Sequence, residues 1–199
     1  MTRMRSKLLI LALLCPLFAA PAHAAPHAPR PYAGVGVLAL KQVAGAEALR
    51  LTLYQEPGLL RIAEFQACAL PRLAGSREEP LLAAGARRGG WTRLAHDDAG
   101  RQGWLEQRRG WEYASWQEFL PGRTVRILPG MKKVLYQLKG DPREAAAAIA
   151  ALNRDQQVRV LQVRDDWARL QTPSGWFRWR DGDGRLTVSL QGGGEAEKR

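Results

Sequence analysis

The sequence predicts a mainly β protein made of two small antiparallel β-barrels, with one short helix inserted in the second. Three observations lead to this fold class: an internal repeat, short apolar runs in near-alternation with polar residues, and frequent turns rich in Gly, Asp and Pro. Composition alone would allow one medium domain or two small ones in residues 25–199, the chain expected after removal of a signal sequence. The repeat favours two.

The repeat is centred on tryptophan. Residues 91–94, WTRL, are similar to residues 167–170, WARL. A second tryptophan follows each copy, Trp104 after 13 residues and Trp179 after 12. In this alignment Arg101 stands opposite Trp176. An apolar run that ends in a two-residue turn, at residues 89–90 or 165–166, precedes each copy, so one supersecondary pattern occurs twice.

Each copy is expected to form strands. Residues 157–164, QVRVLQVR, place apolar side chains in near-alternation with polar ones, which is typical of a half-buried strand. Residues 167–171 follow a tight turn at residues 165–166 and predict the partner strand. Further turns are predicted at residues 96–100, 173–175 and 181–184. Short strands with frequent turns describe a small antiparallel barrel.

These features resemble the bacterial SH3 domain. The apolar strand, the turn, Trp-x-x-Leu and then Gly-x-x-Gly-Trp-Leu at residues 100–105 follow the order of that family, whose usual closing pattern is Gly-Trp-Val. The second copy ends Gly-Trp-Phe-Arg-Trp and has Arg178 where the glycine before Trp179 would stand. The resemblance covers residues 48–110 and 130–190. It implies tandem extracytoplasmic modules that bind peptidoglycan, peptides or a neighbouring protein and carry no chemistry of their own.

The N-terminus has the pattern of a secretory signal. Three basic residues precede an uncharged apolar run at residues 8–20, and Ala22-His23-Ala24 supplies the small residues of a cleavage site. We expect cleavage after Ala24 and a periplasmic or secreted protein. Cys15 raises the alternative of a lipoprotein, but the bulky Leu14 precedes this cysteine, at the position where a lipobox has Gly, Ala or Ser.

The remaining segments complete the domain plan. Residues 25–47 form an N-terminal segment, residues 111–129 a linker, and residues 191–199 a disordered tail. The start DPRE at residues 141–144 predicts a helix to about Leu152, because Asp, Pro and Glu occupy favoured first-turn positions. The aromatic spacing in residues 111–120 fits either a helix or a further strand.

The tryptophans are the main candidates for a binding surface. Trp91, Trp104, Trp167 and Trp179 recur in both copies and are expected to be structural. Trp176 is unmatched in this alignment and is the better candidate for an exposed ligand contact, with Arg178 and Arg180 beside it. Trp111 and Trp116 are further candidates.

Charge indicates the partner class. Cleavage after Ala24 would remove three basic residues and no acidic one, so the formal charge of +11 would fall to +8. An exported basic protein is expected to meet a cell-wall polymer, a peptide or an envelope protein rather than nucleic acid, and an anionic membrane surface is a further candidate. A solvated basic surface without a partner would explain the same charge. The oligomeric state stays open.

An enzyme is not expected. No cofactor motif occurs, and metal binding is not expected because hairpin turns explain the acidic clusters at residues 96–98 and 181–184. Only Cys68 survives signal cleavage among the cysteines, so an internal disulfide is excluded. The alternative function is an accessory or catalytic envelope hydrolase with a site around Cys68 and His96.

Overall fold

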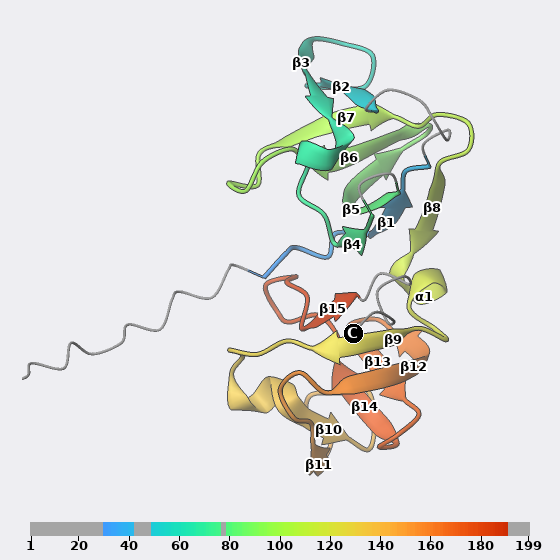
Figure 1. Ribbon diagram of the computed structural model, residues 1–199. Coiled ribbons are helices and arrows are strands. Elements are labelled where there is room, and N and C mark those ends of the chain that lie inside the picture. The colour runs from blue at the N-terminus through green and yellow to red at the C-terminus, as the bar shows by residue number, and fades with distance from the viewer. Residues whose placement is uncertain (1–29, 42–48, 77–78, 191–199) are drawn as a thin grey trace, which may run out of the picture.

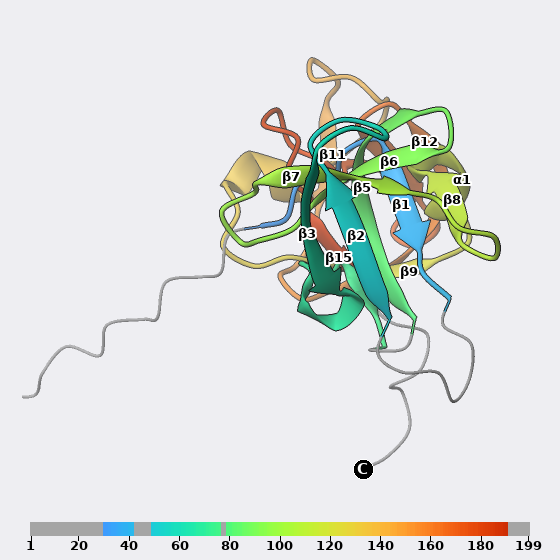
Figure 2. The same cartoon turned by 90° about the horizontal axis from the view of Figure 1, so that it is seen from above.

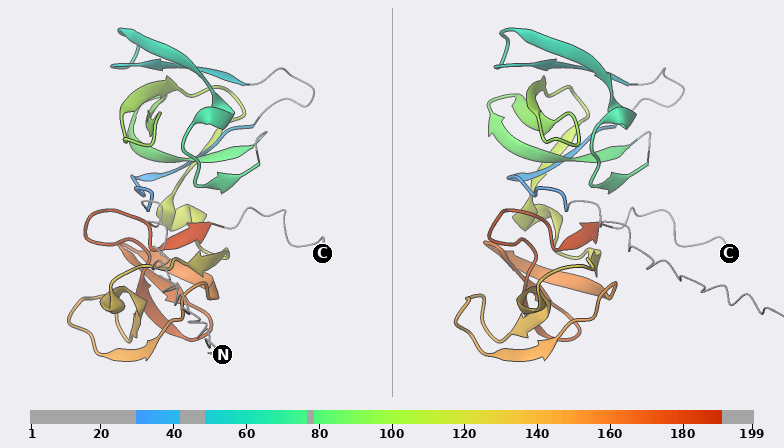
Figure 3. Two further views of the ribbon diagram at one scale, coloured as in Figure 1. Left: turned by 60° about the vertical axis from the view of Figure 1, so that its left-hand side comes forward. Right: turned by 90° about the vertical axis from the view of Figure 1, so that its left-hand side faces the viewer.

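The protein is mainly β and contains two antiparallel sheets. A computed structural model describes residues 30–41, 49–76 and 79–190. Figure 1 shows the two sheets one above the other, and Figure 3 shows the same arrangement from two further sides. The strands of the first sheet are β1 (Gly36–Ala39), β2 (Arg50–Tyr54), β3 (Arg61–Gln66), β4 (Ala74–Gly75), β5 (Pro80–Arg88), β6 (Trp91–Ala95), β7 (Gln102–Glu106) and β8 (Glu112–Ser115). Those of the second are β9 (Thr124–Ile127), β10 (Gln137–Lys139), β11 (Ala148–Ala151), β12 (Gln157–Arg164), β13 (Trp167–Leu170), β14 (Gly175–Arg178) and β15 (Val188–Leu190).

The two sheets have the same topology. The first runs β3-β2-β7-β6-β5-β1-β8, with β4 paired to β5, and the second runs β11-β10-β14-β13-β12-β9-β15. Each strand of the second sheet therefore has a counterpart in the first, and β4 is the single addition. Trp91 on β6 and Trp167 on β13 begin equivalent strands. The internal repeat that the sequence predicts is a repeat of structure; closure of each sheet into a barrel stays a prediction.

Two β-bulges recur at matching places. Gly85 in β5 and Leu161 in β12 are the extra residues opposite Arg93-Leu94 and Arg169-Leu170. Ile62 in β3 and Ile149 in β11 are the extra residues opposite the last two residues of β2 and β10. A bulge bends its strand and raises the local twist. Both copies are therefore bent at the same two points.

The bulged isoleucines meet a matching glycine in each copy. A Cβ on Gly103 of β7 would lie 3.0 Å from Leu53 and 3.2 Å from Ile62. A Cβ on Gly175 of β14 would lie 2.6 Å from Leu138 and 3.0 Å from Ile149. In each copy a glycine thus leaves room for a leucine and an isoleucine, which come from β2 and β3 in the first copy and from β10 and β11 in the second.

Each copy encloses buried apolar side chains. The first core contains Leu38, Leu53 and Leu105, and the second contains Leu138 and Phe177, all at most 2% exposed. The second core extends to Ala33, Val37 and Trp116, which precede β9 in the chain. The two copies consequently pack against each other through buried side chains, in addition to their covalent connection.

The junction between the copies is built on two tryptophans. The α-helix α1 (Trp116–Phe119) begins with a capping box formed by Ser115 and Glu118. Trp116 is 3% exposed, and its ring centroid lies 5.1 Å from that of Trp179. Its indole Nε1 donates to the carbonyl of Ala33 at 2.9 Å. The short helix therefore anchors both copies.

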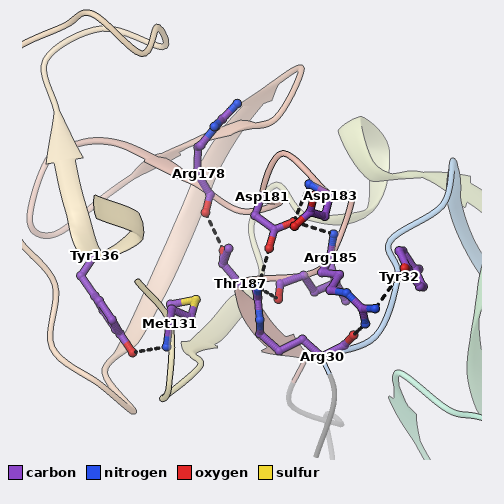
Figure 4. A network of polar contacts seen from close by, with 10 residues as sticks. Arg30, Tyr32, Met131, Tyr136, Arg178, Asp181, Asp183, Arg185 and Thr187 are labelled. Carbon is purple, nitrogen blue, oxygen red and sulfur yellow. Dashed lines mark hydrogen bonds and ion pairs between the residues drawn. The ribbon is translucent and has the colours of Figure 1, made fainter. Parts of the chain in front are cut away.

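The segment before β1 also crosses to the second copy, as Figure 4 shows. Arg30 donates to a carboxylate oxygen of Asp181 at 2.5 Å, and Tyr32 forms a β-bridge with Arg185. Burial by itself would raise the pKa of Asp181, but hydrogen bonds from the Arg185 amide, the Arg30 guanidinium and the Asp183 amide hold it below its usual value. We call residues 30–34 the strap.

The structure corrects the predicted helix at residues 141–152. Residues 148–151 form β11, which pairs with β10, although Ala-rich segments favour helix. A short isolated helix is marginal in water, so the paired edge of β10 decides the conformation. The one α-helix in the described residues is α1, ahead of the second sheet.

Two predicted boundaries also need correction. The predicted linker at residues 111–129 contains β8, which belongs to the first sheet, and β9, which belongs to the second. The predicted N-terminal segment at residues 25–47 contains β1, which pairs with both β5 and β8. These strands come from distant parts of each copy, so the local repeat around tryptophan did not include them.

Some predictions lie outside the described residues. These are the signal sequence at residues 1–24 with its cleavage site, and the tail at residues 191–199. Among the helices in the described ranges, none has the length and apolarity needed to cross a membrane.

Candidate binding faces

Trp176 lies on the outward face of the second sheet. Phe177, its neighbour on β14, is 1% exposed and faces the core, so Trp176 points the other way and is partly buried. Its cross-strand neighbours are Lys139 on β10 and Arg169 on β13. Arg169 is exposed, and no ion-pair partner for it occurs among the described residues. Trp176 and Arg169 thus present an indole and a free guanidinium side by side.

Arg178 is the next outward residue of β14 and covers Trp167. Its guanidinium carbon lies 5.5 Å from the Trp167 ring centroid. It pairs with Glu144 at 3.1 Å and approaches Asp166 at 4.0 Å. Trp167 is only 7% exposed because this arginine lies over it. The predicted ligand contact Arg178 is therefore engaged within the protein.

Arg180 is held at the junction. Its Nε and Nη2 donate to Asp166 Oδ1 at 2.8 and 2.5 Å, and its Nη1 donates to the carbonyl of Gly34 at 3.0 Å. The guanidinium also lies 4.9 Å from the Trp179 ring centroid. Arg180 thereby ties the β12–β13 turn to the strap, and its donors are occupied.

Trp111 and Trp116 do not present their rings to a ligand. Trp111 is 6% exposed and belongs to the first core, and Trp116 is 3% exposed at the junction. Trp111 directly precedes β8 and Trp116 directly follows it, and each packs in a different core. The expectation of two exposed contacts here is corrected.

The strand register changes the alignment of the tryptophans. Trp104 pairs with Arg93, and Trp176 pairs with Arg169, so Trp104 and Trp176 are the equivalent residues. Eight residues separate Leu94 from its partner Gly103, whereas four separate Leu170 from its partner Gly175. This difference shifted the sequence alignment and made Trp176 look unmatched.

The tryptophans expected to be structural differ in burial. Trp104, Trp167 and Trp179 are 8%, 7% and 1% exposed. Trp91 is partly exposed and packs edge-on against Tyr54, with ring centroids 5.3 Å apart. The sequence analysis did not propose Arg169 as a site residue. Arg169 and Arg93 occupy the same position of the WxRL repeat, and this match could have identified it.

The loop at residues 140–147 folds over one side of the Trp176 face. Lys139 Nζ donates to the carbonyl of Glu144, and the Glu144 carboxylate pairs with Arg178. Beside it lies an open, mainly polar hollow lined by Asp141, Pro142, Arg143, Arg164 and Asp165. Arg164 is exposed and adds a second arginine without an ion-pair partner in the described residues.

Cys68 and His96, the residues of the alternative enzyme site, form no hydrogen bond or ion pair with each other among the described residues. His96 stacks on Phe65 with ring centroids 5.0 Å apart, and its Nδ1 lies 3.9 Å from an Asp97 oxygen. Cys68 is exposed and its thiol contacts Gln66 at 3.7 Å. Within the described residues, no cluster of three or more His, Cys, Asp or Glu side chains is arranged to hold a metal ion.

Comparison with protein-family models, with curated proteins and with solved structures found no match to this chain.

Proposed function

We propose that the chain is an exported, non-catalytic binding protein of the cell envelope that recognises a carboxylate-bearing cell-wall polymer through the Trp176 face. A wall peptide or an envelope protein of the same chemistry would be bound in the same way. The observation that carries the proposal is the Trp176–Arg169 pair, where a partly exposed indole adjoins an exposed, unpaired guanidinium.

The chemistry of the pair fits such a ligand. Arg presents a planar fork of donors that matches a carboxylate, and Trp supplies a large apolar surface that binds sugars or peptides when water is displaced. An exposed ion pair alone contributes little and is screened by salt, so the indole would provide most of the binding free energy. The repeated topology supports two modules of one kind in the chain.

Co-sedimentation with purified sacculi tests the proposal. We expect the wild-type chain to bind, and Trp176→Ala to cost about 2 kcal/mol of binding, or roughly 30-fold in affinity. Arg169→Gln should cost several-fold, and this loss should shrink as salt is raised. Neither variant should change the thermal melt strongly, because both side chains point away from the core.

The control is Arg126→Gln, which removes the same charge from β9, away from β14 in the sheet order. It should bind as the wild type does. The proposal is wrong if wild-type protein does not bind sacculi, or if folded Trp176→Ala binds normally. Release of soluble wall fragments that depends on Cys68 or His96 would instead support the hydrolase alternative.

Export is tested separately. The N-terminal sequence of protein recovered from the cell envelope should begin at Ala25. A mature chain that begins at Cys15 would identify a lipoprotein.

A further inference from the structure

The turn between β2 and β3 presents an unusual apolar tip. Leu59 and Leu60 are 68% and 69% exposed, the highest values among the large apolar side chains of the described residues. The hairpin lies at the end of the molecule farthest from the second sheet (Figure 1), and it is nearest the viewer in Figure 2. Two adjacent leucines at this position are exposed to water, and neither of them belongs to a core of the fold.

Aromatic side chains lie at the base of this tip. A Cβ on Gly58 would be 3.9 Å from the Trp91 ring, and Trp91 in turn packs edge-on against Tyr54. Both rings are only partly buried. Trp and Tyr are the side chains that favour the boundary between lipid and water. The tip therefore has an apolar end and an amphipathic base.

Arginines lie on the side of the tip that faces the β5–β6 hairpin. Arg88, in the β5–β6 hairpin, is 73% exposed and lies 3.9 Å from Glu56 of the tip. The amide of Gln107 donates to the carbonyl of Gly90 at 2.8 Å, which places the next loop, with Arg108 and Arg109, against that hairpin.

Acidic residues offset only part of this charge. Glu56 lies near Arg88, Glu64 pairs with Arg61 at 2.7 Å, and Glu106 is exposed. Arg108 and Arg109 are both exposed, and neither has an ion-pair partner in the described part of the chain. The region around the leucines is thus net basic.

We propose that this tip, residues 56–60 with Trp91 and the neighbouring arginines, docks on an anionic phospholipid bilayer. The leucines enter the boundary between headgroups and acyl chains, and the arginines pair with lipid phosphates. Exposed apolar side chains together with basic residues are what peripheral attachment needs, because one attraction alone gives weak and reversible binding. The inference goes beyond the proposed function and does not depend on Trp176.

Vesicle co-sedimentation tests it. The chain should bind vesicles of phosphatidylcholine mixed with phosphatidylglycerol and bind vesicles of phosphatidylcholine alone much more weakly. The double variant Leu59→Ser/Leu60→Ser should lose at least about tenfold in binding to the mixed vesicles, since both apolar contacts are removed. Arg108→Gln/Arg109→Gln should also weaken binding, and salt should reduce the difference from wild type.

Leu161→Ser is the matched control. Leu161 is a 48% exposed leucine at the β12 bulge, and its replacement should leave vesicle binding unchanged. All variants share the same N-terminus, so a retained signal sequence would affect them equally. Circular dichroism confirms folding.

Three outcomes would overturn the proposal. They are failure of the wild-type chain to bind mixed vesicles, normal binding by the folded double leucine variant, and equal loss in Leu161→Ser. Self-association of wild-type protein that the double leucine variant abolishes, without vesicle binding, would identify the tip as a contact between copies of this chain. Sacculus binding is measured on the same variants and should be unaffected, so failure here is separate from failure of the proposed function.

Discussion

The two copies have the same strand order and the same bulges, yet the loops between their outer strands have opposite character. In the first copy, residues 55–60 connect β2 to β3 and expose Leu59 and Leu60. In the second, residues 140–147 connect β10 to β11, and Glu144 returns to contact Lys139 and Arg178. One loop projects apolar side chains into water; the other folds back on its own sheet.

This difference shows where the copies can diverge without loss of the fold. The residues that are matched between copies, such as Gly103 and Gly175, lie where strands approach closely. The residues that differ lie outside the cores, where a substitution changes little free energy of folding. The scaffold is duplicated, and the exposed surfaces of the two copies differ.

The largest expected effect separates Trp167 from its counterpart Trp91. Trp167→Ala should lower the free energy of unfolding by about 3 to 5 kcal/mol, because it empties a buried site under Arg178. Trp91→Ala should cost about 1 to 2 kcal/mol, since its ring is partly exposed and its main contact is Tyr54. Urea unfolding followed by circular dichroism measures both. Equal losses would show that the two copies use this tryptophan in the same way.

A smaller effect is expected at the matched glycines. Gly175→Ala should cost about 2 kcal/mol, because the new Cβ would lie 2.6 Å from Leu138 and must displace it. Gly103→Ala should cost about half as much, since its closest contact, to Leu53, is 3.0 Å. The same unfolding experiment ranks the two variants. A larger loss at Gly103 would mean that the first copy is the more tightly packed.

The smallest expected effect on stability concerns the strap. The strap packs against the second copy, and the first copy has no equivalent contact among the described residues. The pKa of Asp181 is lower in the folded protein than its ordinary 3.8, so the charged form is favoured by folding. Its stabilisation is present above that value and is lost as the pH falls below 3.8 through the folded pKa.

Asp181→Asn checks the strap directly. We expect the difference in melting temperature between wild type and variant to be present at neutral pH and to shrink at a pH below 3.8. Hydrogen exchange of the Ala33 amide, which donates to Gly184 at 2.9 Å, should speed up in the variant. Unchanged exchange would mean that Arg30 and Asp181 do not hold the strap.

The sequence by itself determined the β class and the duplication. Near-alternation in residues 157–164 predicts β12, and the WxRL repeat identifies β6 and β13 as equivalent, because these patterns depend on local side-chain spacing. The sequence also predicted the turns at residues 89–90 and 165–166. The structure confirms them, because Gly89 and Asp165 both have the positive φ of tight turns.

Only the tertiary structure decided which tryptophans are equivalent and which surfaces are open. Trp176 matches Trp104 through strand pairing, and this match was concealed because the paired residues Leu94 and Gly103 are four residues further apart than Leu170 and Gly175. The Ala-rich segment at residues 148–151 is a strand because β10 offers it hydrogen bonds, although its own propensity favours helix. Trp116 is buried because the strap and Trp179 meet around it. Each of these outcomes depends on contacts between residues far apart in the chain, and a pattern within one segment carries no information about them.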